Sequence, residues 1–156
     1  MKDQSAIETY RTDRITVLSV SPHEQDHSPV KGLFGNSRWT VLTASNISTA
    51  RALLKEHDTS VVVCECDLMP GTWIDMLNHI EAVPHPPSLI VTSRLADDRL
   101  WAEALNLGAY DVLAKPFDRT ELLRSVRLAW EHWRREVALL VAADEGNDCG
   151  KLKEYA

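Results

Sequence analysis

The stretch NLGAYDVLAKPFDRTELL, residues 106–123, predicts the end of one helix, a short strand and the start of another helix. Gly108 is a natural helix C-cap, because glycine adopts the left-handed backbone conformation at little steric cost. The apolar run from Tyr110 predicts a strand. Asp118 and Glu121 have the spacing of a capping box, which predicts that the next helix begins there. Helix, strand and helix that follow one another so closely indicate an α/β protein.

Four further apolar runs precede this stretch, and segments of helical periodicity separate them. They are ITVLSV from Ile15, WTVLTA from Trp39, SVVVCE from Ser60 and SLIVTS from Ser88. Strands that alternate with helices predict a parallel sheet with helices on both faces. The predicted fold is therefore α/β, a doubly wound (βα)5 sandwich around a five-stranded parallel sheet.

The chain length of 156 residues and its 44% hydrophobic content fit one domain, which can bury a core without disulfides or metal. We expect a polar tail over residues 1–14, a domain with an extended final helix over 15–140 and a flexible polar tail over 141–156. Apolar residues continue along the final helix beyond the needs of one core. They predict packing on a second chain or, alternatively, large side chains that cover the domain's own end.

Composition excludes several classes of protein. The net charge of -6 gives no general attraction to nucleic acid, so we expect no nucleic-acid partner. No apolar run approaches the roughly 20 residues of a membrane span, and the first residues lack the apolar core of a secretory signal. The expected location is cytoplasmic, without membrane contact. Cys64, Cys66 and Cys149 show no CxxC spacing, and we assign them no chemistry.

The segment His23-Glu24-Gln25-Asp26-His27 matches the letters of the HExxH zinc-protease motif. That motif requires the middle of a regular helix, whereas Pro22 and Pro29 stand on either side of this segment, and proline disrupts helical hydrogen bonding. The sequence also offers no evident third ligand. We therefore expect neither a bound metal nor a metalloprotease.

From about Ile15 to Trp133 the chain resembles the receiver domain of two-component response regulators, the CheY-like fold. VTS at 91–93 resembles the family's switch segment, and residues 106–123 resemble its fifth strand and the entry to its final helix. The resemblance implies that Thr92 and Lys115 contact a phosphoryl group and that the Lys115–Pro116 peptide bond is cis. Both side chains would stand at the carboxyl edge of the sheet, where open α/β sheets bind ligands.

The metal site and the switch of that family are altered in this sequence. Alignment on Pro22 places Ser19 and Val20 at the positions of the metal-binding acids, and two neutral side chains cannot replace two carboxylates on Mg²⁺. Val112 stands at the position of the aromatic switch residue. We therefore expect a degenerate receiver, a pseudo-receiver, whose state does not depend on phosphorylation.

The phosphoacceptor position is also altered. The apolar run before it and the helix after it favour Glu65, whereas alignment on Pro70 favours Cys66; Asp67 is the nearest aspartate but follows the strand end. We rank them in that order. A glutamate is one methylene longer than an aspartate, so its carboxylate would reach toward Lys115 and imitate the phosphorylated state. The alternative is a solvated carboxylate without function.

The expected function is signal transduction by a single-domain pseudo-receiver that binds proteins, with a histidine kinase or another signalling protein as partner. We expect no enzymatic activity and no cofactor. A homodimer would form through the helix between Asp97 and Gly108, the strand from Tyr110 and the final helix. Large aromatic residues are typical interface anchors, and the candidates are Trp101, Trp130 and Trp133.

The alternative function is that of an atypical phosphoacceptor in a phosphorelay, with Mg²⁺ ligands recruited from Glu24 or Asp26. An enzyme on the same sheet would need a glycine-rich phosphate loop after the first strand or a nucleophile with its base. The sequence shows neither.

Overall fold

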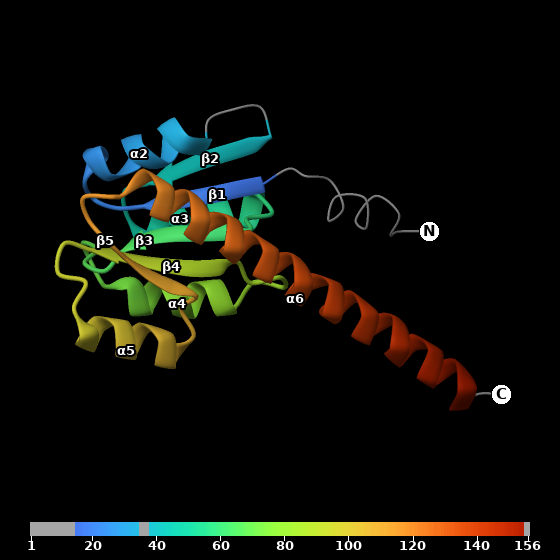
Figure 1. Cartoon of the computed structure of the whole chain (residues 1–156). Helices are drawn as coiled ribbons and strands as arrows, with labels where there is room; N and C mark the ends of the chain where they lie inside the picture. The colour runs from blue at the N-terminus through green and yellow to red at the C-terminus, as the bar shows by residue number, and fades with distance from the viewer. Residues whose placement is uncertain (1–14, 35–37, 155–156) are drawn as a thin grey trace.

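The computed structural model describes residues 15–34 and 38–154, with side chains as far as residue 146; the tail predicted for residues 1–14 lies outside the described residues. Within the described ranges, strands and helices alternate along the chain (Figure 1). The elements are β1 (Ile15–Val20), α2 (Glu24–Phe34), β2 (Trp39–Ala44), α3 (Ile47–Glu56), β3 (Val61–Glu65), α4 (Trp73–Glu81), β4 (Ser88–Ser93), α5 (Asp98–Leu107), β5 (Asp111–Ala114) and α6 (Arg119–Glu154).

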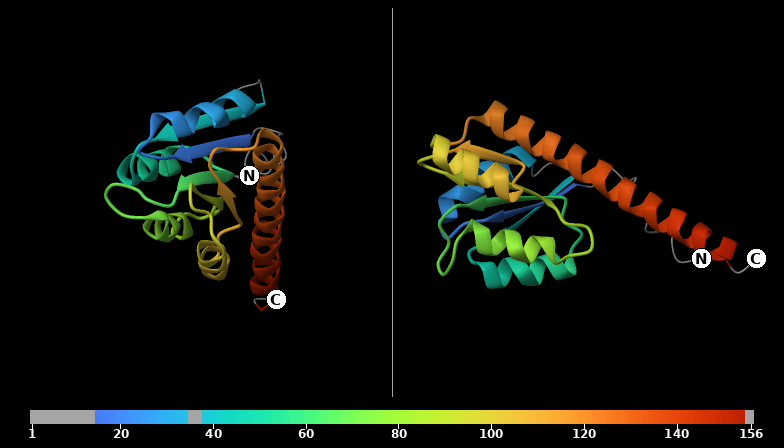
Figure 2. Two further views of the ribbon diagram at one scale, coloured as in Figure 1. Left: turned by 60° about the vertical axis from the view of Figure 1, so that its left-hand side comes forward. Right: turned by 90° about the horizontal axis from the view of Figure 1, so that it is seen from below.

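The strands form one parallel sheet in the order β2-β1-β3-β4-β5. Helices cover both faces of the sheet (Figure 2), and a separate apolar core fills each side. Helices α3, α4 and α5 contribute to one core, which includes Leu54, Met76 and Ala104. Helices α2 and α6 contribute to the other, which includes Phe34 and Leu122. The predicted doubly wound (βα)5 fold is confirmed.

The predicted helix boundaries around β5 are confirmed. Gly108 ends α5 in the left-handed conformation, with φ of 111°. The Asp118 Oδ1 atom accepts a hydrogen bond of 3.0 Å from the backbone N–H of Glu121, which satisfies one of the unpaired donors at the start of α6. A capping box formed by Thr72 and Asp75 begins α4 in the same manner.

Pro29 lies inside α2, so this segment is helical although a proline stands within it. A proline in a helix costs about 3 kcal/mol. Val30 and Phe34 are fully buried on the same helix, and burial of each contributes about 1.5–3 kcal/mol. Packing against the sheet therefore offsets the cost of the proline.

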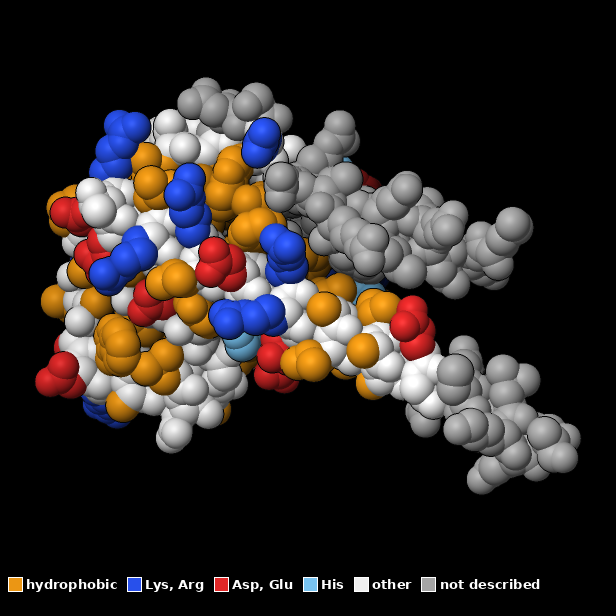
Figure 3. Space-filling view, turned by 45° about the vertical axis from the view of Figure 1, so that its right-hand side comes forward, with side chains coloured by type: hydrophobic (Ala, Val, Ile, Leu, Met, Phe, Trp, Pro, Cys, Tyr) orange, Lys and Arg blue, Asp and Glu red, His pale blue; other side chains and the backbone are white. Residues whose placement is uncertain are grey.

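Helix α6 continues to Glu154, so it does not end at residue 140 as predicted. No proline interrupts residues 141–154, and each residue added to an existing helix costs little. The helix projects beyond the body of the domain (Figures 1 and 2). Figure 3 shows hydrophobic side chains where α6 leaves this body, and Leu139 is 65% exposed there. In the described residues no helix combines the length and apolar character that a membrane crossing requires.

Candidate functional site

The candidate site lies at the edge of the sheet where the parallel strands end. Glu65 is the last residue of β3 and pairs in register with Thr92 near the end of β4. Lys115 directly follows β5. Ser19 and Val20 end β1, between β2 and β3. The topology therefore brings residues from four strands to one edge, as open α/β sheets do at their ligand sites.

A buried ion cluster occupies this edge. The Lys115 ammonium group forms an ion pair with Glu65 Oε2 and donates a hydrogen bond of 2.8 Å to Asp26 Oδ2. Two hydroxyl groups add to it. Thr92 Oγ1 donates to Glu65 Oε2 at 3.4 Å, and Ser21 Oγ donates to Asp26 Oδ2 at 2.6 Å. One cation thus lies between two carboxylates that few water molecules reach.

The cluster shifts the pKa values of two of its members. Burial by itself raises the pKa of Asp26, but hydrogen bonds from Lys115 and Ser21 and the charge of Lys115 outweigh burial, so the pKa lies below its ordinary value. Burial by itself lowers the pKa of Lys115. Hydrogen bonds to Asp26 and Glu65, with their charges, outweigh this effect and raise the pKa above its ordinary value. Both groups are therefore charged at neutral pH.

These shifts predict how stability depends on pH. Because the pKa of folded Asp26 lies below 3.8, the unfolded chain binds more protons in acid, and stability is lost as the pH falls through the folded pKa. The contribution of Lys115 is lost only as the pH rises above 10.5. We expect Asp26→Asn to reduce the loss of stability below about pH 5, as measured by urea unfolding across the acid range.

Asp144→Asn is the matched control, since it removes one exposed carboxylate on α6. A pH profile of Asp26→Asn that parallels that of the wild type would contradict the pairing of Asp26 with Lys115.

Asp26 and His27 reach the site because α2 begins just after β1. His27 Nδ1 lies 2.8 Å from Ser19 Oγ, and His27 Nε2 lies 3.2 Å from the carbonyl oxygen of Ser21. These contacts orient the first turn of α2. From the sequence, Asp26 was predicted only as a recruited Mg²⁺ ligand, His27 was considered only within the HExxH segment, and Ser21 was not predicted at the site. The available signal was the density of serines, acids and histidines over residues 19–27, at the end of the first strand.

The HExxH letters do not form a zinc site. Both ring nitrogens of His27 are engaged inside the domain, whereas His23 and Glu24 are exposed. Glu24 Oε1 lies 3.9 Å from the Lys31 ammonium group and takes no part in the buried cluster. Of the two acids considered as recruited metal ligands, only Asp26 enters the site.

The two other acceptor candidates lie near the cluster. The Cys66 thiol is half-buried and donates to Glu65 Oε1 at 3.6 Å. Burial and the nearby carboxylates of Glu65 and Asp67 raise the pKa of this thiol. A hydrogen bond with Ser93 lowers the pKa but does not outweigh them. Asp67 is exposed and forms an isolated bridge with Thr72. Of the three candidates, Glu65 is the one in contact with Lys115 and Thr92.

Comparison with known proteins identifies the family. The response regulator receiver domain model matches residues 17–127. The chain belongs to this family. The match runs from within β1 through β5 to the first quarter of α6, and it includes each member of the ion cluster. The receiver family serves signal transduction in two-component systems.

One curated relative and two solved structures show the extent of the similarity. The sensory transduction protein LytR of Staphylococcus saprophyticus is 30% identical over 83 residues, which is 53% of this chain and 32% of LytR. The signal receiver domain of an HD domain-containing protein from Pseudomonas fluorescens is 28% identical, with a TM-score of 0.73 over 81% of this chain and 94% of that one. The beryllofluoride-activated NtrC4 receiver domain dimer has 24% identity and a TM-score of 0.69 over 76% and 98%.

The receiver domain spans between 23% and 40% of the length of the curated relatives that it matches. One of them is a protein-glutamate methylesterase/protein-glutamine glutaminase of Desulfotalea psychrophila. The similarity to these proteins therefore concerns a part of each of them.

The residues of this receiver domain do not fit the Mg²⁺ ion of the family. Ser19 Oγ is engaged by His27, and Val20 lies in the apolar core. The carboxylates of Asp26 and Glu65 already hold the Lys115 ammonium group. Ligand atoms of Glu65, Cys66 and Asp67 lie within 4.8 Å of one another, but a thiol with a raised pKa is a poor ligand for a cation that prefers oxygen.

The switch and interface positions differ in how far they are exposed. Val112 is buried in the core beneath α5, and Trp101 is 44% exposed on α5. Trp130 is partly buried against the other core. Trp133 is only 7% exposed, and its indole N–H donates to the carbonyl oxygen of His85 at 3.4 Å. Trp133 covers the domain's own end, which is the alternative left open for the apolar residues of the final helix, and Trp101 is the most exposed of the three interface candidates. The Lys115–Pro116 peptide bond is cis, as predicted.

Proposed function

We propose that the ion cluster of Asp26, Lys115 and Glu65 holds this receiver domain in one signalling state, and that the domain acts by binding proteins without being phosphorylated. The observation that carries the proposal is the position of Lys115 between two buried carboxylates. In the family, the equivalents of Thr92 and Lys115 contact the phosphoryl group. Here both contact Glu65.

The electrostatics of the cluster support this function. A phosphoryl group adds about two negative charges beside two carboxylates that share a single ammonium group. Like charges at such short range disfavour one another strongly when buried. Without a metal ion to offset them, a phosphoryl group would have to displace Lys115 from at least one carboxylate. The Glu65 carboxylate therefore takes the place of the activating anion.

A phosphorylation experiment tests the proposal. We expect no stable mass gain when the protein is incubated with a small phosphodonor and Mg²⁺ and its intact mass is measured. A gain of one phosphoryl group would overturn the proposal in favour of the alternative, an atypical phosphoacceptor. The entry of Asp26 into the site is the observation that favours this alternative.

Matched variants then locate any phosphoryl group that is found. Loss of the mass gain in Asp67→Asn but not in Glu65→Gln would assign the acceptor to the exposed aspartate. The reverse pattern would assign it to the buried glutamate.

We further propose that a second copy or a signalling protein binds the face formed by α5, β5 and α6. Trp101 and Leu105 are exposed on α5, and tryptophan is enriched among residues that dominate binding energy. We expect Trp101→Ala to weaken self-association in analytical ultracentrifugation by at least tenfold, equal to about 1.4 kcal/mol.

Met69→Ala is the control for this variant, because Met69 is also a large exposed apolar side chain but lies between β3 and α4. A monomeric profile for wild type and Trp101→Ala alike would exclude the homodimer. A kinase or another protein would then remain as the partner of this face.

A further inference from the structure

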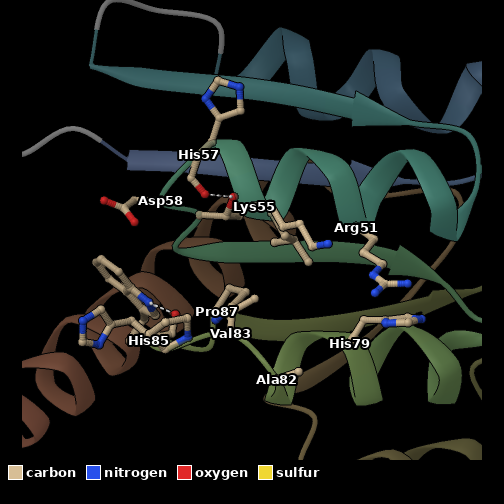
Figure 4. A pocket seen from close by; sticks show the side chains of 13 residues that line it. Arg51, Lys55, His57, Asp58, His79, Ala82, Val83, His85 and Pro87 are labelled. Atoms are coloured by element: carbon tan, nitrogen blue, oxygen red, sulfur yellow. Dashed lines mark hydrogen bonds between the residues drawn. The ribbon is translucent and has the colours of Figure 1, made fainter.

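A cavity of about 620 Å³ lies at the opposite edge of the sheet from the ion cluster. Its walls come from the ends of α3 and α4, from the segments that lead into β3 and β4, and from α6. Figure 4 shows these side chains around one hollow. The volume is that of small-molecule sites, which span roughly 300–1,000 Å³. The cavity is separate from the ion cluster, and the proposed function assigns no role to it.

The two ends of the cavity differ in chemistry. Arg51 and Lys55 are one helical turn apart on α3, and His79 faces them from α4 (Figure 4). The other end is lined by His57 and His85, and by the indole of Trp133, whose N–H donates to the carbonyl oxygen of His85. Among the lining residues Asp58 is the one carboxylate, and it lies toward the His85 end in Figure 4. Two cations thus lie at one end of the cavity, and aromatic rings with one carboxylate lie at the other.

The basic end favours an oxyanion. The chain as a whole carries a net charge of -6, whereas this end of the cavity carries the two positive charges of Arg51 and Lys55. Arginine offers a planar pair of donors that matches phosphate oxygens, and lysine adds a point charge. His79 faces Arg51 from α4 and adds an imidazole ring to this end. The other end, with the indole of Trp133 and the ring of His85 in its wall, suits a flat ring.

We propose that this cavity binds a small organic phosphate, with its phosphate at Arg51 and Lys55 and its flat ring toward Trp133. The ligand would contact α3 and α6 at once. Because Trp133 lies on α6 before the helix leaves the domain, an occupied cavity would fasten the base of the projecting helix to the sheet. The ligand thereby gives the domain an input separate from the ion cluster.

Calorimetry with three probes on the full chain tests the proposal. Adenosine monophosphate carries both a phosphate and a flat ring, inorganic phosphate carries only the first and adenosine only the second. We expect adenosine monophosphate to bind at least tenfold more tightly than either of the others. Equal affinity for inorganic phosphate would reduce the site to a simple anion site, and an absence of binding by all three probes would overturn it.

Variants assign the binding to this cavity. Arg51→Gln with Lys55→Gln is expected to weaken adenosine monophosphate binding by at least tenfold, whereas Arg99→Gln, an exposed arginine on α5, leaves it unchanged. Both altered positions are exposed, and unchanged thermal melting verifies the fold. In the wild type the indole N–H resonance of Trp133 shifts on titration. Binding that survives the double variant, or a resonance that does not move, would place the ligand elsewhere.

Discussion

Lys115→Met is expected to lower the free energy of unfolding by about 3–5 kcal/mol, the range observed when one partner of a buried ion pair is removed. Methionine fills a similar volume but carries no charge. The carboxylates of Asp26 and Glu65 would then remain buried beside each other without a cation. Urea unfolding at neutral pH, followed by tryptophan fluorescence, measures the loss.

Lys31→Met is the control for the loss of a lysine. Its side chain is 52% exposed and its ion pair with Glu24 is 3.9 Å long, so we expect a change within about 0.5 kcal/mol. A second variant isolates the electrostatic part. Adding Glu65→Gln to Lys115→Met removes one of the two buried charges and is expected to recover part of the lost stability.

The outcome also bears on function. A loss smaller than about 1 kcal/mol in Lys115→Met would mean that the ion cluster contributes no more than an ordinary hydrogen bond. The proposal of a state held by this cluster would then lose its physical basis. A large loss with recovery by Glu65→Gln would establish that the charges of the cluster are coupled.

The sequence predicted the fold and one half of the site because these depend on local patterns. Alternating apolar runs predicted the strands, and the resemblance to receiver domains assigned Glu65, Thr92 and Lys115 to one edge of the sheet. Asp26 was not predicted as the partner of Lys115, since the two residues are 89 positions apart. No periodicity or motif in the sequence predicts the direction of a side chain on the first turn of α2.

The helix through Pro29, the end of the final helix and the surroundings of Trp133 could not be predicted from local patterns. Propensity disfavours a helix at Pro29, and tertiary burial of the same helix outweighs it. The polar composition after residue 140 suggested a tail, but polarity alone does not end a helix. Trp133 lies on an apolar stripe of the final helix, and the same sequence pattern is expected whether the stripe packs on a partner or on the domain's own end. The contact of Trp133 with His85 shows that it packs on the domain's own end.

Phe34→Ala is expected to lower the free energy of unfolding by about 3–5 kcal/mol and to disturb the ion cluster from a distance. Phe34 is 1% exposed and packs on Trp39 with ring centroids 4.7 Å apart. His27 and Phe34 are both buried, seven positions apart on α2, so they share the helix face that packs on the sheet. A cavity at Phe34 would therefore loosen the helix that carries Asp26.

Two measurements separate this effect from a general loss of stability. Phe34→Leu keeps most of the volume and is expected to cost about 1.5 kcal/mol or less, with the site intact. Carboxyl NMR titration of Asp26 reports the site directly. In Phe34→Ala the pKa of Asp26 is expected to rise toward its ordinary value, because contact with Lys115 weakens. If that pKa stays where it is in the wild type, then β1 and Ser21 fix Asp26 without help from the packing of α2, and the proposed link between core and cluster fails.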